Sequence, residues 1–449
     1  MNNNINYDKF QEKEIAILRE AMDKADKFIS KKNIRSKIIK DILKIIEDFI
    51  KKKKLLLYGG TAINNILPKY DQFYNPNYDI PDYDFFSTTA IDDAKELADL
   101  YAKKGFSDVE AKAGIHIGTY KVFVNFIPIA DITQMNETIY NNLKKDQLVR
   151  NGLCYTPPNY LRMSCYLELS RPAGDISRWE KVLKRLTLLN KHHPIKTKDC
   201  NIQNFITKFN IKNANKKDLF RIVKDAAIKD GMVFFGGFAM LFYSKYISSV
   251  EKKILIDNPT FDVLSTTPKL STEKLVKIIK ESMSAISKND EISYEKVDGI
   301  DDIIPEHYIV KVNKISLISI YKTQACHNFN TIKDNNKTIK IATIDTMLSF
   351  YLAFIYTNKP YYNPERILCI AEYLFKVQAR NRFKQTGVLK RFTAKCYGKQ
   401  DTLQNIRAEK ANIYKKLKDK KYTKKYEKYF LRYIPKTKKR SKERRKANE

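Results

Sequence analysis

The apolar positions of the chain first form a short continuous run that stops at a pair of glycines. Residues 55–58 read LLLY and are followed by Gly59-Gly60-Thr61, after which residues 62–67 have a helical composition. A short apolar run that ends in glycine is typical of a buried strand that stops at a tight turn. The pattern therefore predicts a strand, a turn and a helix in this order.

Two further apolar stretches carry acidic residues. Asp82 and Asp84 are separated by one residue and precede two phenylalanines, and an alternating run over residues 121–130 ends at Asp131. Side chains two apart on a strand point to the same face, so the first two carboxylates should lie together. We expect Asp131 beside them, on the neighbouring strand.

Apolar residues at helical spacing predict helices around these strands. The clearest cover residues 9–27, 34–50, 91–104 and 175–190. The predicted fold class is therefore α/β (α+β), with mixed sheets flanked by helices.

The pattern occurs twice. Residues 232–240 read MVFFGGFAM, against LLYGGTAI at residues 56–63, and Phe261-Asp262 begins the same motif as Tyr83-Asp84, in the same order. We interpret this as two tandem units. The alternative is a chance resemblance of two α/β segments.

The second unit lacks the acidic residues of the first. Phe238 stands in place of Thr61, Thr260 in place of Asp82, and residues 318–322 read ISIYK where a third aspartate would end the strand. One carboxylate, Asp262, cannot hold two metal ions. We predict that this unit is a degenerate, inactive copy.

The residues of the first unit indicate phosphate chemistry. Gly59, Gly60 and Thr61 would let backbone N–H groups at a helix start face an anion. Three carboxylates within about 4–5 Å repel each other by several kcal/mol unless cations neutralise them. Two Mg²⁺ (or Mn²⁺) ions could then support nucleotidyl transfer. The alternative is an ordinary turn with solvated acids.

A basic segment after the third acidic strand could contact a triphosphate. The candidates are Arg162, Arg171, Lys181 and Arg185. The alternative is a solvated helix with Trp179 in the core.

The charge points to a polyanionic partner. The chain has 449 residues, 43% of them apolar, and a formal net charge of +33, which suggests nucleic acid more than an acidic membrane surface. Residues 415–446 mix Lys and Arg with aromatic residues, a combination suited to single-stranded RNA, although such blocks are also typical of solvated tails. We expect a helix to about Tyr433 and disorder after Pro435.

The sequence gives little support for secretion, for a membrane partner or for disulfide bonds. The first residues do not resemble a signal peptide, and the longest apolar run, at residues 341–356, is broken by Asp345 and Ser349, so no membrane partner is expected. The six cysteines form no C-x-x-C pair, which favours free thiols.

The ordered set of glycine turn, D-x-D strand and lone aspartate resembles the nucleotidyltransferase superfamily of DNA polymerase beta. With the degenerate second copy and the segment ELSRPAGDISRWEKV at residues 168–182, the chain resembles the catalytic poly(A) polymerases of large nucleocytoplasmic DNA viruses. Poxviruses, African swine fever virus and giant amoeba viruses carry members of this family. The resemblance covers about residues 50–375.

This resemblance implies a template-independent enzyme that adds AMP from ATP to the 3′ end of viral mRNA. Asp82, Asp84 and Asp131 would bind two Mg²⁺ or Mn²⁺ ions, with Gly59, Gly60 and Thr61 at the triphosphate. It also implies that the partners are RNA and ATP, with self-association as a homodimer, and that the enzyme works in the host cytoplasm (viral factory) or virion.

The expected domains are N-terminal helices (1–50), a catalytic domain (51–200), an inactive copy (201–375) and a basic C-terminal segment (376–449). Two other functions stay open. The acceptor could be a tRNA, a protein or a small molecule, although residues 85–92 lack the Arg-rich signature usual in CCA-adding enzymes. A non-catalytic RNA-binding scaffold is the other, against which the intact acidic triad argues.

Overall fold

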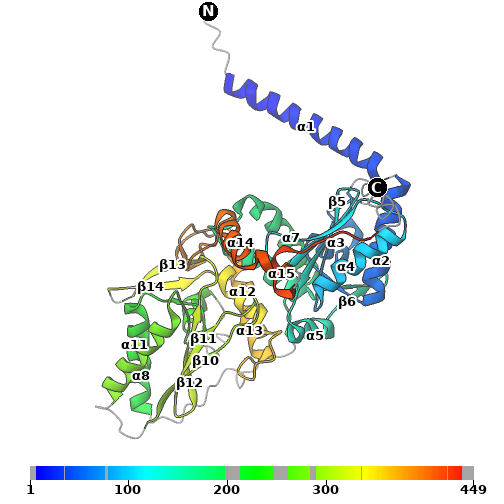
Figure 1. Cartoon of the computed structure of the whole chain (residues 1–449). Coiled ribbons are helices and arrows are strands. Elements are labelled where there is room, and N and C mark those ends of the chain that lie inside the picture. Colours follow the sequence, from blue (N-terminus) through cyan, green and yellow to red (C-terminus); the bar gives the residue numbers. More distant parts are fainter. Residues whose placement is uncertain are drawn as a thin grey trace, which may run out of the picture. The chain divides into compact units, whose positions relative to one another are not determined.

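The computed structural model describes residues 7–34, 36–75, 79–197, 200, 213–246, 261–283, 290–334, 336–421 and 423–436 (Figure 1). The chain forms two compact units. Unit 1 contains Met1–Gln134, Gln147–Thr156 and Lys410–Glu449, and unit 2 contains Met135–Asp146 and Pro157–Glu409. These divisions do not coincide with the predicted boundaries after residues 50, 200 and 375.

Unit 1 is an eight-stranded mixed sheet with the strand order β16-β3-β4-β5-β2-β1-β7-β6. Its strands are β1 (Leu56–Leu57), β2 (Tyr83–Ser87), β3 (Val109–Ala113), β4 (Thr119–Val124), β5 (Ile127–Gln134), β6 (Leu148–Arg150), β7 (Leu153–Tyr155) and β16 (Arg432–Tyr433). Its helices are α1 (Tyr7–Ile34), α2 (Lys37–Lys53), α3 (Gly59–Ile66), α4 (Ala90–Lys103) and α15 (Lys424–Phe430), and α14 (Leu403–Leu417) crosses from unit 2 into unit 1.

The apolar stripes of α2 and α4 explain how these helices cover the sheet. Ile42, Ile46 and Ile50 on α2 are fully buried, as are Leu97 and Tyr101 on α4. The Tyr101 hydroxyl donates a hydrogen bond of 2.8 Å to the carbonyl of Ile42, which satisfies a polar group inside this contact. The helices predicted at residues 34–50 and 91–104 are thus confirmed with small shifts of their ends.

The end of unit 1 differs from the prediction of a helix running to about Tyr433. α15 ends at Phe430, and β16 pairs antiparallel with β3 at the edge of the sheet. The Tyr433 hydroxyl donates a hydrogen bond of 2.8 Å to Asp99 Oδ1. The helix prediction was wrong because strand pairing with a segment about 320 residues away leaves no local signal. The predicted disorder after Pro435 falls mostly on residues 437–449, which lie outside the described residues.

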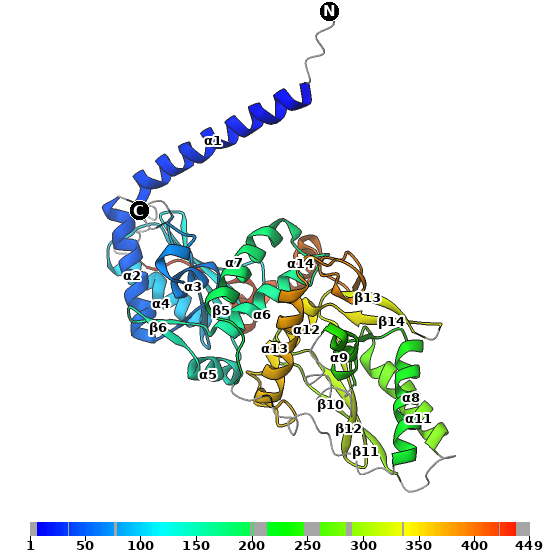
Figure 2. The same cartoon turned by 180° about the vertical axis from the view of Figure 1, so that it is seen from behind.

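Unit 2 contains a second eight-stranded mixed sheet with the order β10-β11-β12-β9-β8-β14-β13-β15. Its strands are β8 (Val233–Phe234), β9 (Phe261–Ser265), β10 (Ile292–Val297), β11 (His307–Val312), β12 (Ile315–Lys322), β13 (His327–Asp334), β14 (Lys337–Ala342) and β15 (Cys396–Tyr397). Its helices include α5 (Glu137–Lys145), α6 (Pro158–Leu169), α7 (Trp179–His192), α8 (Asn213–Lys229), α9 (Gly237–Tyr243), α11 (Pro268–Met283), α12 (Ile344–Phe354) and α13 (Pro364–Arg380). Figure 2 shows α8 and α11 side by side along this sheet.

The two sheets share the same central topology. In unit 1, β1 is antiparallel to β2, and β2 is parallel to β5 with Asp84 opposite Asp131. In unit 2, β8 is antiparallel to β9, and β9 is parallel to β12 with Asp262 opposite Ser319. The prediction of two similar α/β units is confirmed, and Ser319 occupies the position of the third aspartate. Thr260, predicted to replace Asp82, lies outside the described residues.

Four of the six cysteines form disulfides, contrary to the expectation of free thiols. Cys200 is bonded to Cys369, and Cys326 to Cys396. The second bond follows from strand pairing, since β15 begins at Cys396 beside the start of β13. The partners are 169 and 70 residues apart in the sequence, so their spacing carried no signal. Cys154 and Cys165 are free and buried.

Helices in the described part of the chain offer no segment with the length and hydropathy needed to cross a bilayer.

Candidate active site

The glycine turn and the D-x-D strand of unit 1 are in direct contact. β1 ends at Leu57 and α3 begins at Gly59, whose φ of +72° is a left-handed conformation suited to glycine. A Cβ at Gly59 would lie 2.5 Å from Asp84 Oδ2, so only glycine lets the turn approach this carboxylate. The amide of Tyr58 also donates a hydrogen bond of 2.9 Å to the carbonyl of Asp84.

Two of the three predicted aspartates are paired across the two central strands β2 and β5, and the third lies two residues before the first of them. Asp84 on β2 faces Asp131 on the parallel strand β5, and register partners of this kind project their side chains to the same side. Asp82 directly precedes β2 and is exposed. The Thr61 hydroxyl donates a hydrogen bond of 2.7 Å to the carbonyl of Asp82, which ties the start of α3 to the start of β2.

Tyr58 lies within range of the charges of all three aspartates. Burial and the negative charges of Asp84, Asp131 and Asp82 raise the pKa of Tyr58 well above its usual range. The Tyr58 ring stacks on Phe86 at 3.9 Å, and its hydroxyl lies 2.8 Å from Thr133 Oγ1. The charges of all three carboxylates therefore act on the same tyrosine.

Lys121 partly neutralises this acidic cluster. Its Nζ lies 2.7 Å from Asp131 Oδ1 and 2.5 Å from Oδ2. Lys121 and Asp131 are opposite each other on the antiparallel strands β4 and β5. In this arrangement, no group of three His, Cys, Asp or Glu side chains among the described residues has the geometry of a metal site.

The donor set nevertheless suits hard divalent cations. Magnesium and manganese prefer carboxylate oxygens, and Asp82, Asp84 and Asp131 supply only such ligands. Because Gly59 has no side chain, the turn places no side-chain atom of that residue against the carboxylate of Asp84. The residues therefore fit metal-supported phosphate chemistry, with Lys121 as the cation that holds Asp131 here.

Thr61, predicted to contact a triphosphate, has a structural hydrogen bond that the prediction did not include. Its side chain is buried, with 6% exposed, and its hydroxyl proton is engaged by the carbonyl of Asp82. The N–H groups at the start of α3, from Gly59 to Thr61, form the positive end of the helix. Contact of Gly59, Gly60 and Thr61 with a triphosphate stays a prediction.

The predicted basic contacts Arg162 and Lys181 lie in unit 2, on α6 and α7. Arg162 is fully buried, and its guanidinium donates to Asn190 Oδ1 at 2.6 Å, to Asn159 Oδ1 and to the carbonyl of His193. Burial lowers the pKa of Arg162. These bonds favour a role in joining α6 to α7, whereas the side chain of Lys181 is exposed. Triphosphate binding by either residue stays a prediction.

Sequence reasoning missed Lys121 and Tyr58. The structure has a two-residue turn at Asn125 and Phe126, with positive φ values of 50° and 66°, between β4 and β5. Regular counting outward from this turn would pair Lys121 with Ala130, and only the register shift between Val122 and Phe123 pairs it with Asp131. Nothing in the sequence indicated this shift. Tyr58 carried no signal beyond its place before the glycines.

The segment that contains these residues matches a known family. Residues 44–175 match the family described as poly(A) polymerase catalytic subunit, a segment that contains the glycine turn and all three aspartates. A protein of African swine fever virus (strain Badajoz 1971 Vero-adapted) named as a poly(A) polymerase catalytic subunit is 36% identical over 163 residues, which are 35% of this chain and 34% of that protein. The chain thus spans about a third of the length of this relative.

Two other similarities extend over most of the chain. A protein of Acanthamoeba polyphaga mimivirus with the same name is 24% identical over 455 aligned residues, covering 93% of this chain and 76% of the relative. The crystal structure of the Megavirus polyadenylate synthase has a TM-score of 0.76 and 19% identity, covering 99% of this chain and 89% of that one. At this identity the structural likeness establishes the fold.

Proposed function

We propose that this chain is a poly(A) polymerase catalytic subunit of the kind found in large DNA viruses, and that it adds AMP from ATP to RNA 3′ ends without a template. One observation carries the proposal. Asp84 faces Asp131 across paired strands, with Asp82 two residues away and Gly59 against the carboxylate of Asp84. Carboxylates next to a helix N-terminus are the groups that nucleotidyl transfer requires.

The residues of the chain have separate tasks in this reaction. The start of α3 would bind the triphosphate of ATP through its N–H groups, and Thr61 would hold Asp82 in place. The 3′-hydroxyl oxygen of RNA attacks the α-phosphorus, the bond from that phosphorus to the bridging oxygen breaks, and pyrophosphate leaves. A carboxylate of this acidic cluster would act as the base that takes up the proton of the attacking hydroxyl.

Asp82, Asp84 and Asp131 would hold the divalent cations, Mg²⁺ or Mn²⁺. When bound, two such ions supply positive charge to the attacking and leaving oxygens. Lys121 would have to release Asp131 when the cations bind. When the cations are absent, its ammonium group would stabilise the carboxylate of Asp131.

The partners and the compartment form part of the same proposal. The net charge of +33 supports RNA as the polyanion. Tyr414, Tyr426 and Phe430 of the C-terminal segment pack on one another, with ring centroids 5.3–6.4 Å apart, and stacking of RNA bases on this segment stays a prediction. Self-association and a place in the host cytoplasm or virion stay proposals that follow from the family.

The test is extension of a labelled oligo-RNA with each nucleoside triphosphate separately, in Mg²⁺, in Mn²⁺ and in EDTA. We expect extension with ATP alone, and only with metal. The Asp84→Asn and Asp131→Asn variants should lose at least about 100-fold in rate, since each removes a charge from the cation site.

The matched control is Asp41→Asn, which changes an exposed carboxylate on α2 and should extend RNA normally. Circular dichroism would show that all variants fold. Near-normal extension by folded Asp84→Asn would refute the site. Extension of tRNA but not of oligo-RNA would indicate a different acceptor.

A further inference from the structure

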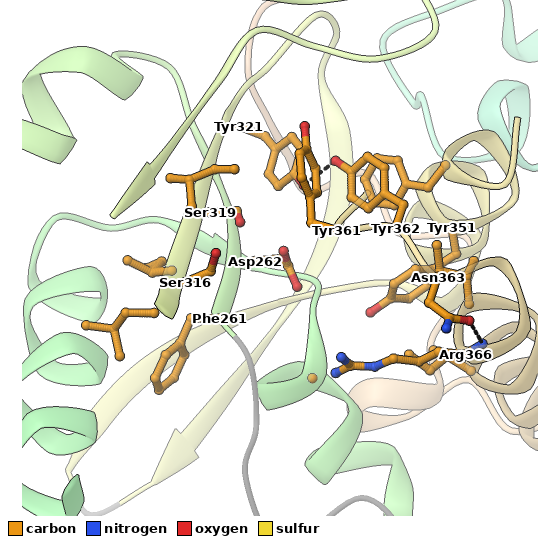
Figure 3. A pocket seen from close by; sticks show the side chains of 17 residues that line it. Phe261, Asp262, Ser316, Ser319, Tyr321, Tyr351, Tyr361, Tyr362, Asn363 and Arg366 are labelled. Carbon is orange, nitrogen blue, oxygen red and sulfur yellow. Dashed lines mark hydrogen bonds between the residues drawn. The ribbon is translucent and has the colours of Figure 1, made fainter. Parts of the chain in front are cut away.

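Unit 2 contains a cavity of about 270 Å³ between the sheet and helices α12 and α13 (Figure 3). Much of its lining is aromatic. The aromatic residues are Phe261, Tyr321, Tyr351, Phe354, Tyr361 and Tyr362. Its size is near the lower end of small-molecule sites, roughly 300–1,000 Å³, which suits a ligand as small as one nucleoside.

The cavity occupies the position that corresponds to the candidate active site of unit 1. Asp262 in the cavity pairs with Ser319 as Asp84 pairs with Asp131. A Cβ at Gly236 would lie 2.1 Å from Asp262 Oδ2, so this turn approaches its aspartate as closely as Gly59 approaches Asp84. Unit 2 therefore keeps the close contact between the glycine turn and its aspartate, although Gly236 has a φ of −86° where Gly59 has +72° and the acidic pair is lost.

Two charges face this cavity. The carboxylate of Asp262 points into it from β9, and the Arg366 side chain extends toward it from α13 (Figure 3). Burial raises the pKa of Asp262 to about 6, and Arg366 lowers it. Ser319 replaces the second carboxylate, so the pair Asp84–Asp131 that would ligate cations in unit 1 has no equivalent here. A ligand with both a hydrogen-bond donor and an anionic group matches Asp262 and Arg366 together.

The aromatic walls are held in place before any ligand binds. The hydroxyls of Tyr321 and Tyr362 lie 2.5 Å apart, and the Tyr351 hydroxyl donates to the carbonyl of Phe235 at 3.1 Å. The Tyr361 hydroxyl lies 3.2 Å from His307 Nε2. Rings fixed in this way lose little conformational entropy on binding, and they offer flat apolar surface to a planar ligand.

We propose that this cavity binds an adenosine 5′-phosphate unit. The base packs against the tyrosines and donates its exocyclic amino group to Asp262, while the phosphate binds Arg366. A carboxylate acceptor selects a base with an amino group, and the choice of adenine among such bases rests on the proposed function. The unit comes either from free AMP or ATP or from a nucleotide of the RNA product.

The experiment is photo-crosslinking of the full chain with 8-azidoadenosine 5′-monophosphate, followed by mass spectrometry of the labelled peptides. We expect label on peptides that carry Tyr321, Tyr361 or Tyr362. Asp262→Asn and Arg366→Gln should each reduce this label at least about tenfold and leave label near Gly59 unchanged. An oligo(A) with a 3′-terminal 8-azidoadenosine, used in parallel, distinguishes free nucleotide from product RNA as the source.

Matched controls are Asp298→Asn, whose carboxylate is 88% exposed, and Arg380→Gln, an exposed residue at the end of α13. Both should keep full labelling. Ser316→Trp places bulk at an exposed residue of the cavity lining and should block labelling even if the charge variants fold poorly. Unlabelled AMP should compete and UMP should not.

Label confined to unit 1, label in unit 2 that Asp262→Asn and Arg366→Gln leave unchanged, or equal competition by UMP would each overturn the proposal. RNA extension is measured on the same preparations. A chain that adds no AMP but is labelled at unit 2 as expected would reject the proposed function and retain this binding site, so the two failures are distinguishable.

Discussion

Gly59 lies so close to Asp84 that a single added methyl group would reach the carboxylate. A Cβ at Gly59 would be 2.5 Å from Asp84 Oδ2, and the residue also has a φ of +72°. Asp84 in turn faces Asp131 on the next strand. The spacing of the acidic cluster thus depends on the absence of a side chain in the turn.

Gly59→Ala should therefore abolish most activity while the fold survives. We expect a loss of at least about 100-fold in the rate of AMP addition, because a displaced carboxylate no longer holds its cation correctly. The strained backbone should cost about 1–3 kcal/mol of stability. Gly105→Ala is the matched control, since Gly105 has a φ of +97° and no atom within 4 Å of its added Cβ. Equal effects of both variants on activity would contradict this explanation.

Lys121→Met should lower the Mg²⁺ concentration needed for half-maximal activity. The Lys121 ammonium contacts both carboxylate oxygens of Asp131 and so competes with a divalent cation. Both side chains are partly solvated, so we expect a shift of about three- to tenfold, less than the unscreened attraction would give. The measurement is a Mg²⁺ titration of initial extension rates.

Lys112→Met is the control for Lys121→Met. Lys112 lies opposite Lys121 on β3, and its Nζ lies over the Phe123 ring and 3.8 Å from Glu110 Oε2. The same net charge is removed, but the Mg²⁺ requirement should not change. If Lys121→Met raised the requirement or left it unaltered, the lysine would act on another group, such as the nucleotide.

The local parts of the site could be predicted from the sequence. The turn at Gly59, the acids Asp82 and Asp84 and the strand that ends near Asp131 each follow from residues close together in the chain. Strand alternation then placed Asp131 beside Asp84, and the structure confirms this pairing. Local pattern suffices where a motif is contained in one element and its neighbour.

Contacts between distant segments could not be predicted in this way. The pairing of β16 with β3 and the disulfide Cys200–Cys369 join residues 169 or more apart, and no periodicity links them. Arg162 looked like a free cation because its sequence gives no sign of Asn159 and Asn190 as acceptors. Tertiary packing decided each of these features.

Asp262 makes the stability of unit 2 depend on pH. Burial raises its pKa to about 6, above the ordinary value of about 4, so the folded state binds the proton more tightly than the unfolded state. The resulting stabilisation is complete below about pH 4 and is lost as the pH rises through about 6. Asp262→Asn removes this dependence.

At pH 7 the Asp262→Asn variant should therefore be more stable than the unmodified chain, by about 1–3 kcal/mol. At pH 4 the difference should vanish. Thermal unfolding at both values, followed by circular dichroism, measures it. A variant that is less stable at pH 7 would show that the ionised carboxylate has a stabilising partner, for which Arg366 is the candidate.

The two disulfides should contribute to the stability of unit 2. Loss of either should cost about 2–5 kcal/mol, since each restricts a long loop in the unfolded chain. Dithiothreitol should lower the melting temperature of the oxidised protein. The Cys326→Ser/Cys396→Ser variant should respond less, because only Cys200–Cys369 remains to be reduced. Equal melting temperatures with and without reductant would show that the thiols are free in solution.

The C-terminal segment has a structural role and a proposed role in RNA binding, and truncation can separate the two. Residues 424–433 belong to the fold of unit 1, because β16 covers the edge of β3 and Glu427 pairs with Lys95 at 2.7 Å. Residues 437–449 add seven Lys or Arg residues beyond it. Deletion of residues 437–449 should leave the melting temperature unchanged and weaken RNA binding.

Deletion of residues 424–449 should lower the melting temperature as well, since it exposes a strand edge and removes the Tyr433–Asp99 hydrogen bond. In both deletion variants, the logarithm of the association constant for single-stranded RNA should depend less steeply on the logarithm of the salt concentration. The slope should fall by about 0.7 for each phosphate that residues 437–449 neutralise in the full-length chain. The matched control for charge is a full-length chain with Gln at those seven basic positions. It should show the same weaker RNA binding and the same shallower salt slope as the deletion of residues 437–449. An unchanged salt slope in both would place the RNA-binding cations elsewhere on the chain.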